Sequence, residues 1–329
     1  MRTTLCDLVG IDSPIVLAPM GGAVTPPLAA AVSNAGALGM LPLSWTSPEE
    51  IPALVEETRR LTERPFGVNL GLAWDQRDRL AAALEAGVRV VSFFWGDAGE
   101  LVGTARSSGA SVFVTAGTAE EARAAAAAGA NVVVAQGWEA GGHVWGTVST
   151  LALVPRVVDT VAPVPVVAAG GIADGRGLAA VLALGAAGAW VGTRFLAATE
   201  AAIHADYRAR ILAAGEADTF YGTLFDRGWP DAPHRTLRNS TVEAWERAGR
   251  PAPGTRPGEA EEPAKRPDGS PINRYAASTP TASMTGDVEP LPHWAGQGVG
   301  LVTREQPAAD IVGSLIAEAE HVIRSLAQT

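Results

Sequence analysis

Short β-like runs alternate with alanine-rich helical stretches from residue 15 to about residue 200. This alternation is typical of repeated βα units, in which helices join parallel strands and cover the sheet. Because eight such strands are each followed by a helix, the pattern favours a closed (β/α)8 barrel, the TIM barrel of the α/β class, over an open doubly wound sheet. The strands are expected at residues 15–20, 37–43, 65–70, 88–96, 111–117, 131–137, 164–171 and 187–195.

Alanine-rich helices are expected between the strands, and several of them run into a glycine, as a helix C-cap does. These helices are expected at residues 26–36, 47–62, 77–87, 119–129 and 175–185.

The hydrophobic rhythm changes after about residue 200. Residues 251–292 contain nine prolines, too many for regular elements, with too few apolar residues for a core. We expect helices near 203–250 and then an extended segment that wraps the barrel mouth, with disorder of 251–285 as the alternative. The sequence therefore predicts three parts: a barrel at 1–202, a helical and Pro-rich insertion covering its mouth at 203–292, and a loop and amphipathic helix docking back on the barrel at 293–329.

Composition and charge exclude several classes of protein. With 47% hydrophobic residues and a mean hydropathy of +0.14, the chain is expected to be globular, and no apolar run reaches the roughly 20 residues of a membrane helix. The N-terminus lacks a signal-peptide pattern, so a cytoplasmic location is expected. A net charge of −10 disfavours nucleic acid and membrane partners.

The numbers and positions of cysteine, lysine and histidine exclude further kinds of site. Cys6 is the sole cysteine, which excludes an internal disulfide and a CxxC zinc site. Lys265 is the sole lysine and lies in the Pro-rich stretch, which excludes a Walker phosphate loop and a Schiff-base lysine on a barrel strand. The histidines lack metal-ligand spacing, so no metal site is expected.

The strand running into a glycine-bearing loop at 131–143, NVVVAQGWEAGGH, is the strongest functional signal. Barrel enzymes carry their sites at the C-terminal ends of the strands. This loop delivers His143 after a polar Gln136, and Gly141 and Gly142 allow close backbone approach to a ligand. A tight turn with a structural histidine is the alternative.

Other strand ends converge on the same edge. Gly170, Gly171, Gly192 and Thr193 follow the seventh and eighth strands, where barrels bind phosphate through amides and a hydroxyl. Such a site needs no lysine, and together with the other strand ends it suggests flavin mononucleotide (FMN). The other strand ends are Met20 and Gly21 after the first strand and the amide side chain of Asn69 after the third.

At these residues the chain resembles the nitronate monooxygenase (2-nitropropane dioxygenase) family of FMN-dependent TIM barrels. The motifs that carry the resemblance are APMGG (18–22), FGVNL (66–70), QGWEAGGH (136–143), AAGGI (168–172), VGTRFLAATE (191–200) and WAGQGVG (294–300). The resemblance implies a catalytic His143 beside the flavin. The expected FMN-binding residues are Met20, Gly21, Asn69, Gln136, Gly141, Gly142, Gly170, Gly171, Gly192 and Thr193.

The resemblance implies oxidation of an alkyl nitronate, or a related small N-oxygenated substrate, by dioxygen to a carbonyl compound and nitrite. His143 is expected to act either as a base or, when protonated, as a charge stabiliser. The alternative is an FMN-dependent NAD(P)H:quinone reductase or enoyl-acyl-carrier-protein reductase, because their histidine loops look similar. A homodimer is compatible with either function.

The substrate pocket is expected to depart from that of the best-studied bacterial enzymes, which carry several tyrosines and a lysine there. This chain has only three tyrosines. Instead, tryptophans at or beyond the strand ends predict a bulky apolar wall, with core packing as the alternative. They are Trp45, Trp95, Trp138 and Trp145. For Glu139, a solvated loop carboxylate is favoured over one that orients His143.

Overall fold

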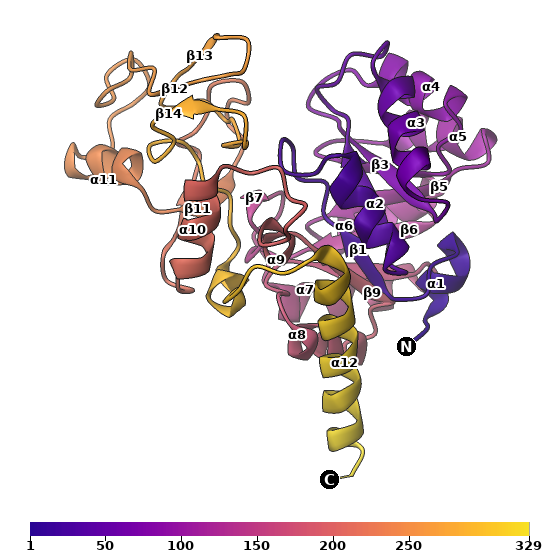
Figure 1. Cartoon of the computed structure of the whole chain (residues 1–329). Coiled ribbons are helices and arrows are strands. Elements are labelled where there is room, and N and C mark those ends of the chain that lie inside the picture. Colours follow the sequence, from indigo (N-terminus) through magenta and orange to yellow (C-terminus); the bar gives the residue numbers. More distant parts are fainter. Residues whose placement is uncertain (329) are drawn as a thin grey trace.

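Eight parallel strands close into a barrel in the computed structural model, which describes residues 1–328 (Figure 1). The strand order is β1-β9-β8-β6-β5-β4-β3-β2, and the barrel closes where Val16 of β1 bridges Leu38, next to β2. All the strands predicted from the sequence are confirmed. They are β1 Ile15–Leu17, β2 Gly39–Pro42, β3 Phe66–Gly71, β4 Val90–Phe94, β5 Ser111–Ala116, β6 Val132–Gln136, β8 Val166–Ala169 and β9 Gly188–Val191.

Helices follow the strands and cover the outside of the barrel. They are α2 Pro26–Asn34, α3 Ile51–Leu61, α4 Arg77–Glu85, α5 Gly99–Ser107, α6 Ala119–Ala127, α7 Thr150–Val161 and α8 Gly175–Ala183, with the short α9 Thr193–Leu196 after β9. The predicted glycine caps are confirmed: Gly36, Gly87, Gly129 and Gly185 all have φ between 83° and 99°. Glycine suits this left-handed conformation because it has no Cβ.

The strands are apolar on both faces because both faces are buried. In β6, Val132 and Val134 point into the barrel, whereas Val133 and Ala135 pack under the helices. The helix α1 Thr4–Val9 contributes Leu5 and Cys6 to the interior cluster. Cys6 is therefore a small apolar core residue.

The insertion differs from its sequence prediction because residues 203–250 are not only helical. Between α10 Ala205–Ala213 and α11 Ser240–Arg247 lies an antiparallel pair, β10 Thr219–Gly222 and β11 His234–Leu237. β11 also pairs with β7 Gly142–His143, a two-residue strand in the His143 loop that the sequence did not reveal. The barrel loop and the insertion therefore share one small sheet.

Residues 251–292 are also more regular than predicted. Three two-residue strands form a second small sheet over an apolar cluster that includes Ile272 and Leu291, so the expectation of no regular elements and no core was wrong. The prolines lie mostly in the connections. The strands are β12 Ala264–Lys265, β13 Pro271–Ile272 and β14 Thr285–Gly286.

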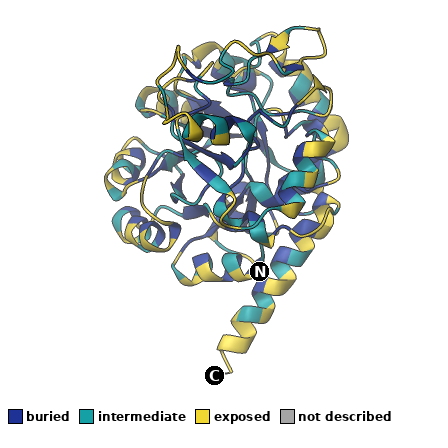
Figure 2. Ribbon diagram, turned by 90° about the vertical axis from the view of Figure 1, so that its left-hand side faces the viewer, coloured by how far each residue is buried: buried dark blue, intermediate teal, exposed yellow. Residues whose placement is uncertain are grey.

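The chain returns to the barrel through the short 3-10 helix η1 Gln297–Leu301 and the long helix α12 Ala308–Leu326. α12 packs on α8, where the Gly175 amide donates to Glu318 Oε2 at 2.9 Å. Figure 1 shows α12 in yellow beside α8, and Figure 2 shows its last turns exposed. Within residues 1–328, no helix has both the length and the apolar character needed to cross a membrane.

Gly175→Ala is expected to destabilise the fold by about 1–3 kcal/mol, because an added Cβ would lie 2.3 Å from the Glu318 Cβ and 2.4 Å from the Ala319 amide nitrogen. Urea unfolding measures this change. Gly313→Ala is the matched control in α12, where an added Cβ meets nothing within 4 Å. That variant is expected to stabilise the protein by up to about 1 kcal/mol. A stabilising Gly175→Ala would show that α12 does not pack closely on α8.

Candidate active site

A cavity of about 620 Å³ lies at the C-terminal ends of the barrel strands. The structure brings every predicted site residue to its wall, although they come from segments far apart in the sequence. These residues are Met20, Gly21, Asn69, Gln136, Gly141, Gly142, His143, Gly170, Gly171, Gly192 and Thr193. The rest of the wall includes residues of the insertion and the loop before α12.

The period of two along each strand explains why these positions meet. Residues two apart point to the same face, so Gln136 continues the inward-facing row of Val132 and Val134. In the same way, Gly192 follows the inward-facing Trp190 by two residues. The inward row is apolar inside the barrel and becomes polar or glycine where the strands end, which makes the floor of the cavity.

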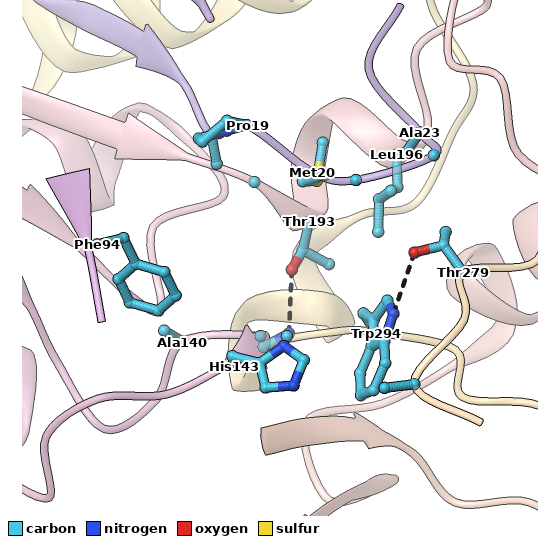
Figure 3. Close-up of a pocket in the computed structure, with 18 of the residues that line it drawn as sticks. Pro19, Met20, Ala23, Phe94, Ala140, His143, Thr193, Leu196, Thr279 and Trp294 are labelled. Carbon is cyan, nitrogen blue, oxygen red and sulfur yellow. Dashed lines mark hydrogen bonds between the residues drawn. The ribbon is translucent and has the colours of Figure 1, made fainter. Parts of the chain in front are cut away.

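The glycines after β8 and β9 leave backbone amides free for an anion. Gly170 and Gly171 have φ of 107° and 72°, a conformation that disfavours other residues. Across residues 1–328, no protein acceptor takes the amides of Gly171, Gly192 or Thr193. The Thr193 hydroxyl accepts a hydrogen bond from the Gly296 amide at 3.0 Å, so it also holds the loop before α12 (Figure 3).

Glycine stands at the two positions before His143 for different local reasons. A Cβ on Gly141 would lie 2.4 Å from the Gly296 nitrogen, so this residue lets the two loops touch. Gly142 has φ of 67° and open space around its Cβ position. Gly141 is therefore set by packing and Gly142 by backbone conformation.

Three predicted polar contacts are already engaged with protein atoms. Gln136 Nε2 donates to the His143 carbonyl at 3.2 Å, and Gln136 Oε1 accepts from the Trp145 amide at 2.8 Å. Asn69 Nδ2 donates to Ser92 Oγ at 3.1 Å, and the Met20 amide donates to the Ala18 carbonyl. Gln136 thus braces the His143 loop, and Met20 presents its side chain to the cavity.

His143 is held by backbone pairing and covered by aromatic rings. Its partner in the β7–β11 register is His234, whose ring centroid lies 5.7 Å away. Trp229, from the segment between β10 and β11, stacks on His143 with a centroid separation of 3.9 Å and an interplanar angle of 26°. Figure 3 shows His143, Trp294 and Thr193 facing the same cavity. His143 Nε2 is buried, and no atom of the described chain hydrogen-bonds it.

Burial, and secondarily the neighbouring His234, lower the pKa of His143 to about 3. Burial also lowers the pKa of His234 to about 4. His234 Nε2 accepts from the Phe225 amide at 3.2 Å, and its Nδ1 lies 2.9 Å from the Ala232 carbonyl, which fits a neutral ring with the proton on Nδ1. Both imidazoles are therefore neutral at pH 7.

Two loop residues have roles that the sequence did not predict. Glu139 neither orients His143 nor lies free in solvent, because its carboxylate accepts from the backbone amide and hydroxyl of Thr150 at the start of α7. Trp138 does not line the cavity; it stacks under the Arg235 guanidinium, 4.3 Å from the ring centroid. Of the other predicted wall tryptophans, Trp45 lines the cavity. Trp95 and Trp145 are not part of its lining and pack on each other instead, with ring centroids 5.0 Å apart.

The sequence did not identify the site residues that the insertion supplies. Trp229, Arg227 and Arg266 line the cavity although they lie far along the chain from the strand ends. The only signal was an aromatic residue in the polar, turn-rich run DRGWPDAP. The sequence does not show which part of the fold this tryptophan packs against.

The wall of the cavity carries one sign of charge. Within the described chain, its lining contains no aspartate or glutamate, and its charged side chains at neutral pH are Arg227 and Arg266. The whole chain has a net charge of −10. A cleft of one sign concentrates ligands of the other sign, so this cavity favours anions over cations.

The free energy of unfolding is expected to fall as the pH drops from about 7 to about 5. Burial lowers the pKa values of His143, His234 and His293 to about 3, about 4 and about 3. In the unfolded chain these histidines protonate near pH 6.5, whereas in the folded chain their rings stay neutral. The free energy of unfolding therefore falls by at most about 1.4 kcal/mol per pH unit for each histidine.

Urea unfolding at several pH values tests this dependence. Carboxylates contribute little in this window because their unfolded pKa values are near 4. His293 lies outside the cavity lining, so His293→Phe serves as the comparison and should make the slope shallower by about a third. A free energy independent of pH in this window would mean that the three rings are not held neutral.

Comparisons with known proteins agree with this geometry. The profile of a family described as nitronate monooxygenase matches residues 2–318. A nitronate monooxygenase from Pseudomonas aeruginosa is 35% identical, over 94% of this chain and 97% of the relative. A (3aS,4S,5R,7aS)-5-hydroxy-7a-methyl-1-oxo-octahydro-1H-indene-4-carboxyl-CoA dehydrogenase from Mycobacterium tuberculosis is 40% identical, over 76% of this chain and 70% of the relative.

Solved structures give the same picture. FabK from Thermotoga maritima superposes with a TM-score of 0.83 at 30% identity, over 100% of this chain and 99% of that one. A nitroalkane oxidase from Streptomyces ansochromogenes superposes with a TM-score of 0.78 at 32% identity, over 98% of this chain and 99% of that one. The likeness extends over the barrel and the insertion alike.

Proposed function

The chain belongs to the nitronate monooxygenase family of oxidoreductases, and on that basis we propose that it oxidises alkyl nitronates with dioxygen to a carbonyl compound and nitrite. The observation that carries this proposal is the neutral, buried His143, whose Nε2 is unpaired within the described chain, on the wall of a cavity that favours anions. A nitronate is an anion, and the corresponding nitroalkane is a carbon acid that needs a base.

FMN is the cofactor of this family, and the residues of the cavity fit it. Within residues 1–328 the amides of Gly171, Gly192 and Thr193 are unpaired and suit a terminal phosphate, and Gly171 has no Cβ to block a close approach. When bound, FMN accepts electrons from the substrate, and dioxygen takes them up. We propose that the remaining predicted contacts, Met20, Gly21, Asn69, Gly141, Gly142 and Gly170, complete its binding site.

We propose that His143 acts as a base and not as a cationic stabiliser. The ring rests neutral because a resident positive charge there would lose hydration and lie beside His234. When the ring takes the proton of a nitroalkane, the imidazolium that forms lies beside the nitronate anion formed in the same step, and their attraction offsets part of that cost. A neutral imidazole can accept a proton from a nitroalkane carbon or share a hydrogen bond with a nitronate oxygen. Gln136 positions His143 through its carbonyl.

The reductase alternative remains distinguishable by its reductant. The likeness to FabK does not favour it, because the family match and the P. aeruginosa relative are both nitronate monooxygenases. Anaerobic mixing of the flavin-loaded protein with NADH, NADPH and a nitronate identifies the reductant. Bleaching by a nicotinamide and not by the nitronate would replace the proposed function with the alternative.

A coenzyme A-linked compound is a second candidate substrate. The M. tuberculosis relative acts on such a compound, and the phosphates of coenzyme A match Arg227 and Arg266 at the cavity. Coenzyme A should then compete with nitronate turnover, and competition should weaken in an Arg227→Gln, Arg266→Gln variant. An absence of competition at millimolar coenzyme A would remove this candidate.

His143→Ala is expected to keep its FMN and to lose roughly 10²- to 10⁴-fold in the rate of flavin reduction by a neutral nitroalkane, the usual contribution of a positioned base. The loss with a preformed nitronate should be much smaller, since its carbon is already deprotonated. Stopped-flow absorbance measures both rates. His321→Ala, on an exposed turn of α12, is the matched control. Equal losses with both substrates would assign His143 to charge stabilisation.

Thr193→Val is expected to weaken FMN retention by roughly 1–3 kcal/mol, because the phosphate and the Gly296 amide both lose a hydroxyl partner. Thr193→Ser keeps that hydroxyl and should retain the flavin. Flavin content across a dilution series measures the difference. If Thr193→Val lowers only the stability of the flavin-free protein, Thr193 holds Gly296 and not FMN.

A further inference from the structure

Trp229 lies against His143 on the wall of the cavity. It is only 6% exposed although it belongs to a connection between β10 and β11. Its ring stacks on His143, and it lines the same cavity. A substrate bound in this cavity beside His143 therefore has the Trp229 indole on the neighbouring wall.

Other indoles fix the position of Trp229. The ring centroids of Trp74, Trp95 and Trp45 lie 4.7, 5.0 and 5.9 Å from that of Trp229, all edge to face. Each comes from a different loop at the strand ends, so the cluster braces Trp229 from several directions. Edge-to-face aromatic pairs gain about 0.5–1.5 kcal/mol beyond their burial. Trp229 is thus a rigid wall element.

Trp45 continues this wall into the open part of the cavity. Its side chain is 57% exposed, and a Cβ on Gly21 would lie 3.0 Å from its ring. A large exposed aromatic side chain beside a cavity is an apolar surface available to a ligand. Trp45 and Trp229 together form what we call the tryptophan wall.

The charges around the cavity decide which ligands this wall accepts. Aromatic rings bind either organic cations or other apolar and aromatic groups. A cation site would normally carry a carboxylate, but the lining within residues 1–328 has none and contributes Arg227 and Arg266. The wall therefore suits the apolar ring of an anion rather than an ammonium group.

We propose that Trp229, with Trp45, is a specificity determinant that selects nitronates carrying a ring next to the reacting carbon over short linear nitronates. This proposal rests on the proposed nitronate oxidation. It adds a substrate class that the family match does not specify. The ring of the substrate packs on the tryptophan wall while its charged end lies toward His143.

The test compares phenylmethyl nitronate with propyl-1-nitronate in the FMN-loaded enzyme. We expect kcat/KM to favour the phenyl substrate by about 10-fold or more, and Trp229→Leu to lower that ratio by about 10-fold. Trp229→Phe keeps a ring and should retain most of the preference. Trp245→Phe, on α11 outside the cavity lining, is the control and should leave the ratio unchanged.

Trp45→Leu keeps the proposal testable if Trp229→Leu does not fold, because Trp45 is largely exposed. It should lower the same ratio by about 3-fold or more. A wild-type enzyme that prefers the propyl substrate, or variants that lower both kcat/KM values equally, would overturn the proposal.

A binding experiment separates this proposal from the proposed function. Phenylacetate and butyrate resemble the two nitronates in shape and charge but are not oxidised, and their binding is read from the flavin absorbance of the loaded protein. Tighter binding of phenylacetate that weakens in Trp229→Leu supports the tryptophan wall even if no nitronate is oxidised. Nitronate turnover with equal binding of both acids would support the function and overturn the wall.

Discussion

The backbone pairing of Gly142–His143 with β11 is the interaction on which the rest of the site depends. It joins a loop of the barrel to a strand of the insertion, across about 90 residues of sequence. It fixes the direction of the His143 side chain and places His234 beside it. The chain that enters β11 also carries Trp229 onto the imidazole. One short ladder therefore positions, buries and covers the residue proposed to do the chemistry.

The burial that follows from this pairing sets the electrostatics of the site. Desolvation holds His143 neutral, and the lack of carboxylates in the lining, within the described chain, leaves Arg227 and Arg266 as its charged side chains. A neutral base can approach an anion or a carbon acid without strong repulsion. The same positive cavity suits the phosphate of FMN at the other strand ends.

Much of the barrel was predictable because its rules are local. Alternation of strand and helix predicted the eight strands. Glycines such as Gly87 and Gly185 predicted helix ends, because glycine readily adopts the positive φ found there. The candidate site residues were predictable because strand ends meet at one edge of a barrel. The hairpin β10–β11 was not predictable from the sequence, because its strand β11 pairs with a partner strand in the distant His143 loop. The partners of Gln136 and Glu139 were missed for the same reason.

The sequence by itself determined the fold class, the edge of the barrel proposed to carry the chemistry, and the kinds of group gathered there. Periodicity and glycine positions are properties of neighbouring residues, so they can be read along the chain. Only the tertiary structure decided that His143 is neutral, that Trp229 stacks on it, and that no carboxylate within the described chain lines the cavity. Burial and charge depend on which distant segments come together, and a linear pattern does not record those contacts.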